Sequence, residues 1–254
     1  MFLGVTDKPL PRDKLSLGCI NKDGLSGSES KGSLYVVLVS TGSFNPPTYM
    51  HLRCFELARD ALSSRRFCVI GGYMSPVNDS YKKKDLIRAE HRVAMCELAC
   101  RSSDFIMVDP WEVSLSLSLS LSLSLSLSLS LSLSLSLTHT HTHRKSYLKV
   151  MLVCGSDLLE SFGIPGFWIR EQVKTICRDF GLVCIRRGGQ NVENIISKDD
   201  ILNEHKNNIL IVGEVVPNGI SSTRLRDCIS RGLSVKYLTE DDVIDYIKQN
   251  KLYT

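Results

Sequence analysis

The sequence predicts an α/β fold built on a parallel sheet with helices on both faces. Short apolar runs rich in β-branched residues recur along the chain, and such continuous runs are typical of strands buried on both faces. Several of these runs end in turns of glycine, proline and hydroxyl residues that lead into helical patterns. Open sheets of this kind bind ligands at the carboxyl ends of their strands, so function is expected at these turns.

Composition narrows the classes of protein further. The 254 residues suffice for one sizeable α/β core, and a formal charge of +4 does not demand nucleic acid as a partner. Nine cysteines without a C-x-x-C pair predict neither a zinc site nor a disulfide framework, and most are expected to be small buried side chains. The absence of a signal peptide or transmembrane pattern favours the cytoplasm or the nucleus. Residues 1–32 are polar and rich in glycine and serine, so we expect a mobile N-terminal arm before one domain at 33–254.

The first strand is expected at 34–39, and it leads into the run G-S-F-N-P-P-T-Y-M-H-L-R from Gly42 to Arg53. Gly42 permits a positive φ, and Thr48 is a candidate N-cap for the helix that follows. His51 then lies in the first helical turn, where backbone N–H groups and the helix dipole attract an anion. The run lacks both the Walker and the dinucleotide-binding patterns. It is a candidate phosphate site, although a purely structural turn would look similar.

A second strand is expected at 67–70, and the loop from Ser75 to Lys84 follows it and ends in three lysines. Most such charge runs are simply exposed to solvent. This one follows the strand beside the first, and Arg88, His91 and Arg92 continue the positive charge on the next helix. The loop is therefore a candidate for delivering lysines to phosphate groups.

The sequence changes character after a third expected strand at 105–108. Residues 114–137 alternate strictly between Ser and Leu, and residues 138–143 between Thr and His. Two adjoining dinucleotide repeats in DNA would encode both stretches in any reading frame, so we interpret them as translated non-coding sequence or an unusual exon boundary. A uniform alternation can neither fix one register nor fill a core. We expect 114–143 to be a low-complexity insert outside the folded core.

The fourth and fifth strands are expected at 149–154 and 182–185. Asp157 follows the fourth strand and could accept hydrogen bonds from a ribose or cap the next helix, and the two roles are compatible. The irregular stretch 162–168 ends in Trp168, whose large ring could plug the core or stack on a planar ligand.

A sixth strand is expected at 209–216, and it runs into the segment P-N-G-I-S-S-T-R-L-R at 217–226. Three successive hydroxyls at a helix start can cap free N–H groups and donate to phosphate oxygens. Arg226 adds a planar fork of donors one turn later. An over-capped helix on a basic surface would show the same pattern. The chain ends in a helix for which Thr239 is the expected cap.

The two turns together are more specific than either alone. The first resembles the G-x-F-x-P-x-x-x-x-H signature of the nucleotidyltransferase superfamily, and the second resembles its I-S-S-T-x-x-R motif. More closely, residues 33–112 and 146–254 resemble the eukaryotic, plant-like family of nicotinamide/nicotinic acid mononucleotide adenylyltransferases. The resemblance implies a Rossmann-like nucleotidyltransferase fold. It also implies transfer of the adenylyl group of ATP to either mononucleotide by direct in-line attack, giving NAD or deamido-NAD and pyrophosphate.

The same resemblance implies roles for individual residues. His51 and Arg226 would be the catalytic residues that hold the ATP phosphates. The ATP-binding set is Gly42, Ser43, Phe44, His51, Ser222, Thr223 and Arg226. The mononucleotide-binding set is Asn45, Lys83, Gly155, Asp157, Phe167, Trp168, Arg187 and Asn218. Mg²⁺ is expected to bridge ATP oxygens and water, with few or no protein ligands.

Two other functions stay open. Another adenylyl- or cytidylyltransferase of the superfamily would share His51 and the I-S-S-T run, although Trp168 and the 75–84 loop favour a pyridine mononucleotide. The second open function is that of an inactive binding or chaperone-like relative. The insert could disable the enzyme, because it replaces a family helix whose start contacts the nicotinamide end. Trp111 matches a different family position and is not given that role. The expected partners are small molecules, without nucleic acid or membrane, and a homo-oligomer is left open.

Overall fold

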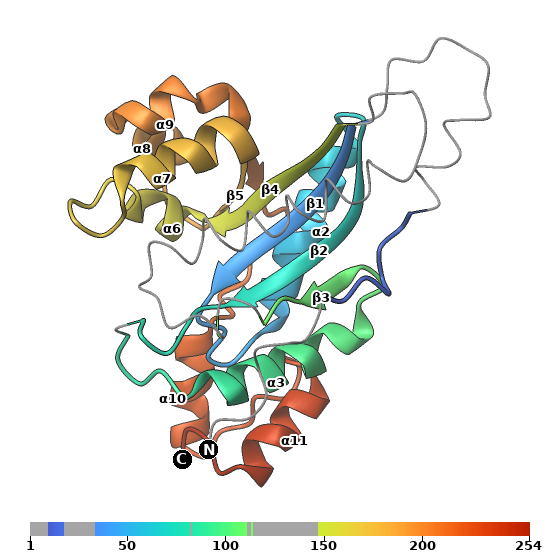
Figure 1. Ribbon diagram of the computed structural model, residues 1–254. Helices are drawn as coiled ribbons and strands as arrows, with labels where there is room; N and C mark the ends of the chain where they lie inside the picture. The colour runs from blue at the N-terminus through green and yellow to red at the C-terminus, as the bar shows by residue number, and fades with distance from the viewer. Residues whose placement is uncertain (1–9, 18–33, 82, 111–112, 114–146) are drawn as a thin grey trace.

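The computed structural model describes residues 10–17, 34–81, 83–110, 113 and 147–254 (Figure 1). At its centre lies a six-stranded sheet in the order β3-β2-β1-β4-β5-β6, with every neighbouring pair parallel. The six predicted strands are confirmed, and the sixth ends short of its predicted boundary. Their bounds are β1 Leu34–Gly42, β2 Phe67–Pro76, β3 Ile106–Val108, β4 Tyr147–Gly155, β5 Leu182–Arg186 and β6 Ile209–Gly213.

The central strand β1 explains why its sequence is continuously apolar. Val36 and Leu38 join the core on one face of the sheet, whereas Val37 and Val39 join the core on the other. All four side chains are fully buried. Successive side chains of a strand point to opposite faces, so a strand covered on both faces carries no polar alternation.

Helices cover both faces of the sheet, as the sequence predicts. The helices α2 and α3 pack on the face of Val36, and α6 to α9 pack on the face of Val37 (Figure 1). The bounds are α2 Tyr49–Ser63, α3 Ala89–Ala99, α6 Ser156–Ser161, α7 Arg170–Thr175, α8 Val192–Lys198 and α9 Asp200–Glu204. Shorter helical turns are η1 Cys100–Ser102, the π-helical η2 Ile176–Phe180, and η3 Lys206–Asn208.

The last two helices are α10 Ser222–Ser230 and α11 Asp241–Gln249. Figure 1 shows them with α3 at the end of the sheet toward which the arrows of β1 and β2 point. Val243 and Ile247 of α11 pack on Met95 of α3, and Leu225 of α10 packs on Ile244. These contacts place the C-terminal part of the chain beside the turns that follow the strands.

Part of the expected mobile arm is packed on the core. Leu15 lies against the buried face that α6 to α9 cover, and the backbone N–H of Ser16 donates to the carbonyl of Ile70 at 2.8 Å. Lys14 donates through Nζ to two main-chain carbonyls near η1, at 2.6 and 2.7 Å. Residues 10–17 of the expected arm thus contact the sheet, with Leu10 and Leu15 against one of its faces, and the mobility of the arm stays a prediction. The rest of 1–32, and the insert at 114–143 with Trp111, lie outside the described residues.

Three local expectations have different outcomes. Thr48 is the N-cap residue of α2, as predicted. The positive φ expected at Gly42 occurs instead at Phe44, where φ is 41°. Thr239 does not cap α11, because the N-cap residue of that helix is Glu240. The hydroxyl of Thr239 instead donates to the carbonyl of Pro47 at 2.9 Å.

Candidate active site

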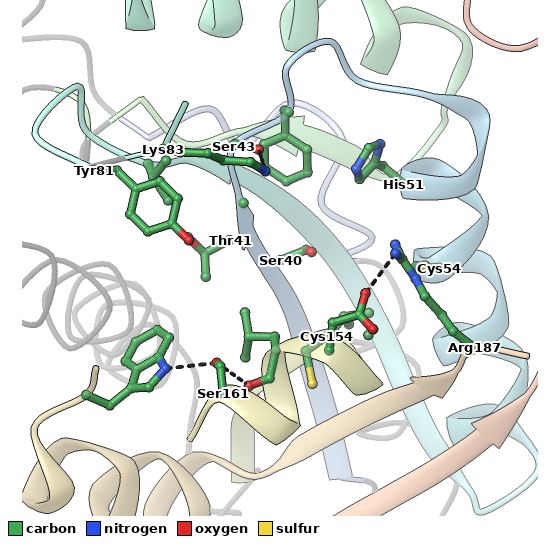
Figure 2. A pocket seen from close by; sticks show the side chains of 18 of the residues that line it. Ser40, Thr41, Ser43, His51, Cys54, Tyr81, Lys83, Cys154, Ser161 and Arg187 are labelled. Carbon is green, nitrogen blue, oxygen red and sulfur yellow. Dashed lines mark hydrogen bonds and ion pairs between the residues drawn. The ribbon is translucent and has the colours of Figure 1, made fainter. Parts of the chain in front are cut away.

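A cavity of about 340 Å³ lies at the carboxyl ends of β1 and β4. The strand order reverses here, because the chain passes outward from β1 through β2 and β3 and returns on the other side of β1 as β4. Open α/β sheets bind ligands at this reversal. Figure 2 shows Ser43 and Lys83 on one side of the cavity and Ser161 on the opposite side. The predicted residues that line it are Gly42, Ser43, Phe44, His51, Lys83, Gly155, Asp157, Phe167, Trp168 and Arg187.

The turn after β1 lines the cavity and carries two backbone N–H groups that are candidate donors to a ligand. The carbonyl of Gly42 accepts from the N–H of Val77 at 3.0 Å, and the carbonyl of Ser43 accepts from Arg92 at 3.2 Å. In a trans peptide the N–H points away from the carbonyl, so the N–H groups of Ser43 and Phe44 point away from these partners. Neither has an acceptor in the described part of the chain. They remain available to an anion in the cavity.

His51 enters the cavity from the first turn of α2. Its Nδ1 accepts from the backbone N–H of Thr48 at 2.9 Å, and the Thr48 hydroxyl lies 2.8 Å from the same atom. Burial, helped by the charges of Arg187 and Lys83, lowers the pKa of His51 from 6.5 to about 4. The ring is therefore neutral at pH 7, and since Nδ1 accepts, the proton lies on Nε2. His51 can donate that Nε2–H to a phosphate oxygen.

Lys83 reaches the same side of the cavity from the loop after β2. Its Nζ donates to Oγ of Ser43 at 3.0 Å (Figure 2). Burial and the nearby charge of Arg226 lower the pKa of Lys83. The two turns that follow the neighbouring strands β1 and β2 thus meet, as the sequence predicts. A phosphate here would face both a lysine and the neutral histidine.

A pair of opposite charges forms the wall near β4 and β5. Arg187 donates to the carboxylate of Asp157 at 3.0 Å, and both side chains are about half exposed. A Cβ on Gly155 would lie 3.3 Å from Nε of Arg187, so the glycine lets the arginine pass close over the end of β4. Because the pair is exposed to solvent, a ligand can compete for either partner at moderate cost.

Aromatic side chains form the wall opposite His51. The indole N–H of Trp168 donates to Oγ of Ser161 at 2.9 Å, and Ser161 donates to the carbonyl of Leu158 at 2.6 Å. The ring of Phe162 meets that of Trp168 edge to face, with centroids 5.1 Å apart. Trp168 packs on the core and also lines the cavity, so its role in the core is confirmed, and stacking on a ligand stays a prediction. Its orientation is fixed before any ligand binds.

The remaining predicted site residues do not line the cavity. Asn45 is fully buried, with its amide N–H on the carbonyl of Asp85 at 2.8 Å. The amide of Asn218 contacts Sδ of Met50 at 3.2 Å, and Thr223 is exposed on α10.

Two further residues of the second motif hold the first turn. The hydroxyl of Ser222 donates to the carbonyl of Pro46 at 2.8 Å, and Arg226 donates to the carbonyl of Asn45 at 2.7 Å. These contacts hold the backbone of the turn that lines the cavity. Direct contacts of Ser222, Thr223, Arg226, Asn45 and Asn218 with a substrate stay predictions.

Several residues of the cavity wall were missed from the sequence. Ser40 and Thr41 lie at the end of β1, and Cys54 lies one turn after His51 on the same face of α2. That helical spacing is a signal that could have found Cys54. Burial raises the pKa of its thiol to about 11, so it is an unreactive part of the wall.

The sequence model of the cytidylyltransferase-like family matches residues 39–228, which span β1 to α10. Among solved structures, a nicotinic acid mononucleotide adenylyltransferase of Plasmodium falciparum complexed with NaAD superimposes with a TM-score of 0.58 at 18% identity. The match covers 86% of this chain and 97% of that one. At this identity the likeness shows the fold, and it confirms the predicted nucleotidyltransferase architecture.

Two plant relatives are much more similar in sequence. A nicotinamide/nicotinic acid mononucleotide adenylyltransferase of Arabidopsis thaliana is 60% identical over 248 residues, which cover 98% of both chains. One of Oryza sativa subsp. japonica is 52% identical over 245 residues, covering 96% of this chain and 94% of the relative. This chain therefore belongs to the family of nicotinamide/nicotinic acid mononucleotide adenylyltransferases.

Proposed function

We propose that this protein transfers the adenylyl group of ATP to nicotinamide or nicotinic acid mononucleotide, releasing pyrophosphate. The observation that carries the proposal is the division of one cavity into two ends. One end offers the Nε2–H of His51, two backbone N–H groups and Lys83, and the other offers the fixed indole of Trp168. A cavity with anion donors at one end and a flat apolar surface at the other suits a pyridine nucleotide beside a triphosphate.

The reaction requires positioning and charge neutralisation. A phosphate oxygen of the mononucleotide attacks the α-phosphorus of ATP, and the bond from that phosphorus to the bridging oxygen breaks as pyrophosphate leaves. His51 donates a hydrogen bond to the phosphate oxygens and has no proton to transfer, because the attacking phosphate oxygen is already ionised at pH 7. Donors fixed before reaction stabilise the developing charge without reorganisation. No covalent intermediate with the protein is needed.

The donors around the first turn bind different phosphates of the substrates. Lys83 and the N–H groups of Ser43 and Phe44 meet the reacting phosphates inside the cavity. Arg226 has N–H donors left after its bond to Asn45, and it lies near enough to Lys83 to lower the pKa of that amine. We assign it to the outer phosphates of ATP, where its planar fork gives paired hydrogen bonds.

The mononucleotide occupies the end of the cavity near β4. Trp168 stacks on the pyridine ring, and Phe167, about half exposed, extends that apolar surface. Asp157 accepts from ribose hydroxyls, and Arg187 then turns from the carboxylate toward the ligand. Within the described residues no group of three His, Cys, Asp or Glu side chains could hold a metal, and the cavity has one carboxylate. This donor set fits Mg²⁺ that arrives on the ATP phosphates with its own water, where it neutralises phosphate charge.

The test is an assay with the purified full chain. ATP is offered with each mononucleotide in turn, and pyrophosphate and dinucleotide are measured together. Matched controls replace ATP by CTP, or the mononucleotide by a sugar phosphate without a pyridine ring. We expect product only with ATP and a pyridine mononucleotide. Equal turnover with CTP would indicate a cytidylyltransferase, and nucleotide binding without product would indicate an inactive relative. In the described part of the chain, no helix is long and apolar enough to span a membrane.

A further inference from the structure

The turn between β1 and α2 is held by side chains from the C-terminal part of the chain. Three successive carbonyls, those of Asn45, Pro46 and Pro47, each accept a side-chain donor. The donors are Arg226 at 2.7 Å, Ser222 at 2.8 Å and Thr239 at 2.9 Å. A fourth contact joins the hydroxyl of Tyr253 to Oδ1 of Asn45 at 2.7 Å. We call Ser222, Arg226, Thr239 and Tyr253 the C-terminal clamp.

The two later members of the clamp lie in well-packed surroundings. Thr239 and Asn45 are fully buried, and Leu252, beside Tyr253, packs on α3 and α11. Burial raises the pKa of Tyr253, so its hydroxyl stays protonated and donates. The other side of Asn45 is held by the carbonyl of Asp85. A buried polar group that loses its partner pays the full cost of desolvation, so these bonds resist rearrangement.

The clamp acts one residue away from the group that orients His51. Pro47 precedes Thr48, whose backbone N–H donates to Nδ1 of His51. The connection that carries Thr239 also contacts the next residue, because the N–H of Tyr49 donates to the carbonyl of Leu238 at 3.2 Å. The direction of the Thr48 N–H therefore depends on where residues 45–47 are held.

We propose that Thr239 and Tyr253 are positioning residues for the adenylyl transfer. Neither lines the cavity. They fix the turn so that Nδ1 of His51 accepts from Thr48 and the proton stays on Nε2, facing the phosphates. The inference rests on the proposed function for its kinetic consequence, but its structural consequence at His51 can be measured independently.

Matched substitutions separate positioning from stability. Thr239→Val removes the threonine hydroxyl and keeps the shape of the side chain. Tyr253→Phe removes the tyrosine hydroxyl in the same way. Tyr246→Phe is the control. Tyr246 lies on α11, in the same C-terminal part of the chain, and its hydroxyl contacts Nδ1 of His91 on α3 at 2.9 Å and not the turn. We expect kcat to fall about tenfold in each clamp variant, the worth of one hydrogen bond, with the KM for ATP changed less. Thr239→Ser keeps the donor and should recover most of the turnover.

The second readout is the tautomer of His51 in the ligand-free protein, followed by imidazole ¹⁵N NMR and assigned with His51→Gln. We expect a protonated Nε2 in the wild type and a shifted or mixed signal in Thr239→Val and Tyr253→Phe, but not in Tyr246→Phe. Unchanged His51 signals, or equal losses of turnover in Tyr246→Phe, would overturn the proposal. If the wild type shows no adenylyl transfer, the proposed function fails, and the NMR comparison alone decides the clamp.

Discussion

The two signature segments, 42–51 and 217–226, are similar in sequence type and differ in what they contact. Each follows a strand, carries hydroxyl and basic side chains and starts a helix. The first lines the cavity with its backbone and with His51. The second lines none of it, and two of its side chains, Ser222 and Arg226, donate to carbonyls of the first. Similar local sequence therefore lines the cavity in one turn and supports that turn from the other.

Position in the sheet explains the difference. The first segment follows β1, which lies beside β4 at the point where the strand order reverses. The second follows β6, which lies at the end of the strand order. Its helix α10 packs instead with α11, and from there only the side chains reach back to the first turn. A motif at the end of the sheet can still shape a site at its centre.

The largest expected effect comes from the first segment. His51→Ala removes the donor that faces the phosphates and should lower kcat about 100- to 1,000-fold, the usual cost of one fixed donor to a transition state. His51 belongs to none of the hydrophobic core clusters that the described residues form, so the melting temperature should change little. Pyrophosphate release and thermal unfolding check the two statements. Turnover near that of the wild type in a folded variant would remove His51 from the mechanism.

The second segment should show a smaller effect. Arg226→Lys keeps the charge but cannot hold the carbonyl of Asn45 and a phosphate with one planar fork. We expect a loss of about ten- to a hundredfold in kcat/KM for ATP, equivalent to two hydrogen bonds. Steady-state kinetics at varied ATP measure it. Unchanged kcat and KM for ATP would show that Arg226 is only a surface charge. The second segment would then not support the first.

The opposite wall of the cavity should respond selectively. Trp168→Ala removes the surface proposed for the pyridine ring and should raise the KM for the mononucleotide about tenfold, within the range of one base-stacking contact. The KM for ATP should stay near that of the wild type. Separate titration of each substrate gives both values. Equal losses for both substrates would show that Trp168 is a structural plug.

A pH dependence follows from the neutral state of His51. Its pKa is lowered from 6.5 to about 4, so between these values the unfolded chain binds a proton that the folded chain does not. The free energy of unfolding should therefore fall as pH drops from about 6.5 to about 4, by about 1–2 kcal/mol at pH 5. His51→Gln should flatten this part of the profile. Urea unfolding of both proteins at pH 7 and pH 5 tests it, and parallel profiles would refute a neutral buried ring.

The smallest effect is expected for the insert, which we propose lies outside the folded core. Residues 114–143 are replaced by a Gly/Ser linker of about twelve residues, because a connection between parallel strands needs a dozen or more. We expect the melting temperature to hold and solubility to rise, since an alternating Ser-Leu segment favours association. If the deletion unfolds the protein, the insert is structural. If activity stays low in the soluble variant, the replaced family helix is what the site lacks.

The parts predicted correctly from the sequence are those with local causes. The strands β1 to β6 appear as apolar runs because both faces are buried, and the place of His51 in the cavity wall follows from its position in a strand-to-helix turn. The contact between Lys83 and Ser43 could be expected because the two loops follow neighbouring strands.

The parts missed depend on contacts between distant residues. Asn45 looks like a ligand in its motif, yet its side chain is taken up by Asp85 and Tyr253, the latter more than 200 residues away in sequence. Arg92 looks like one more positive charge beside the phosphate-binding loop, yet it is fully buried and donates to the carbonyl of Ser43. No local pattern distinguishes a basic side chain that binds substrate from one that binds a carbonyl.

The most direct test of the account is a crystal structure with a non-hydrolysable ATP analogue and the mononucleotide bound together. The account predicts a phosphate oxygen within hydrogen-bond distance of Nε2 of His51 and the pyridine ring against the indole of Trp168. It also predicts that Ser222 and Thr239 still donate to the carbonyls of Pro46 and Pro47. Nucleotides bound away from His51, or a first turn released from Ser222 and Thr239 in the complex, would contradict it.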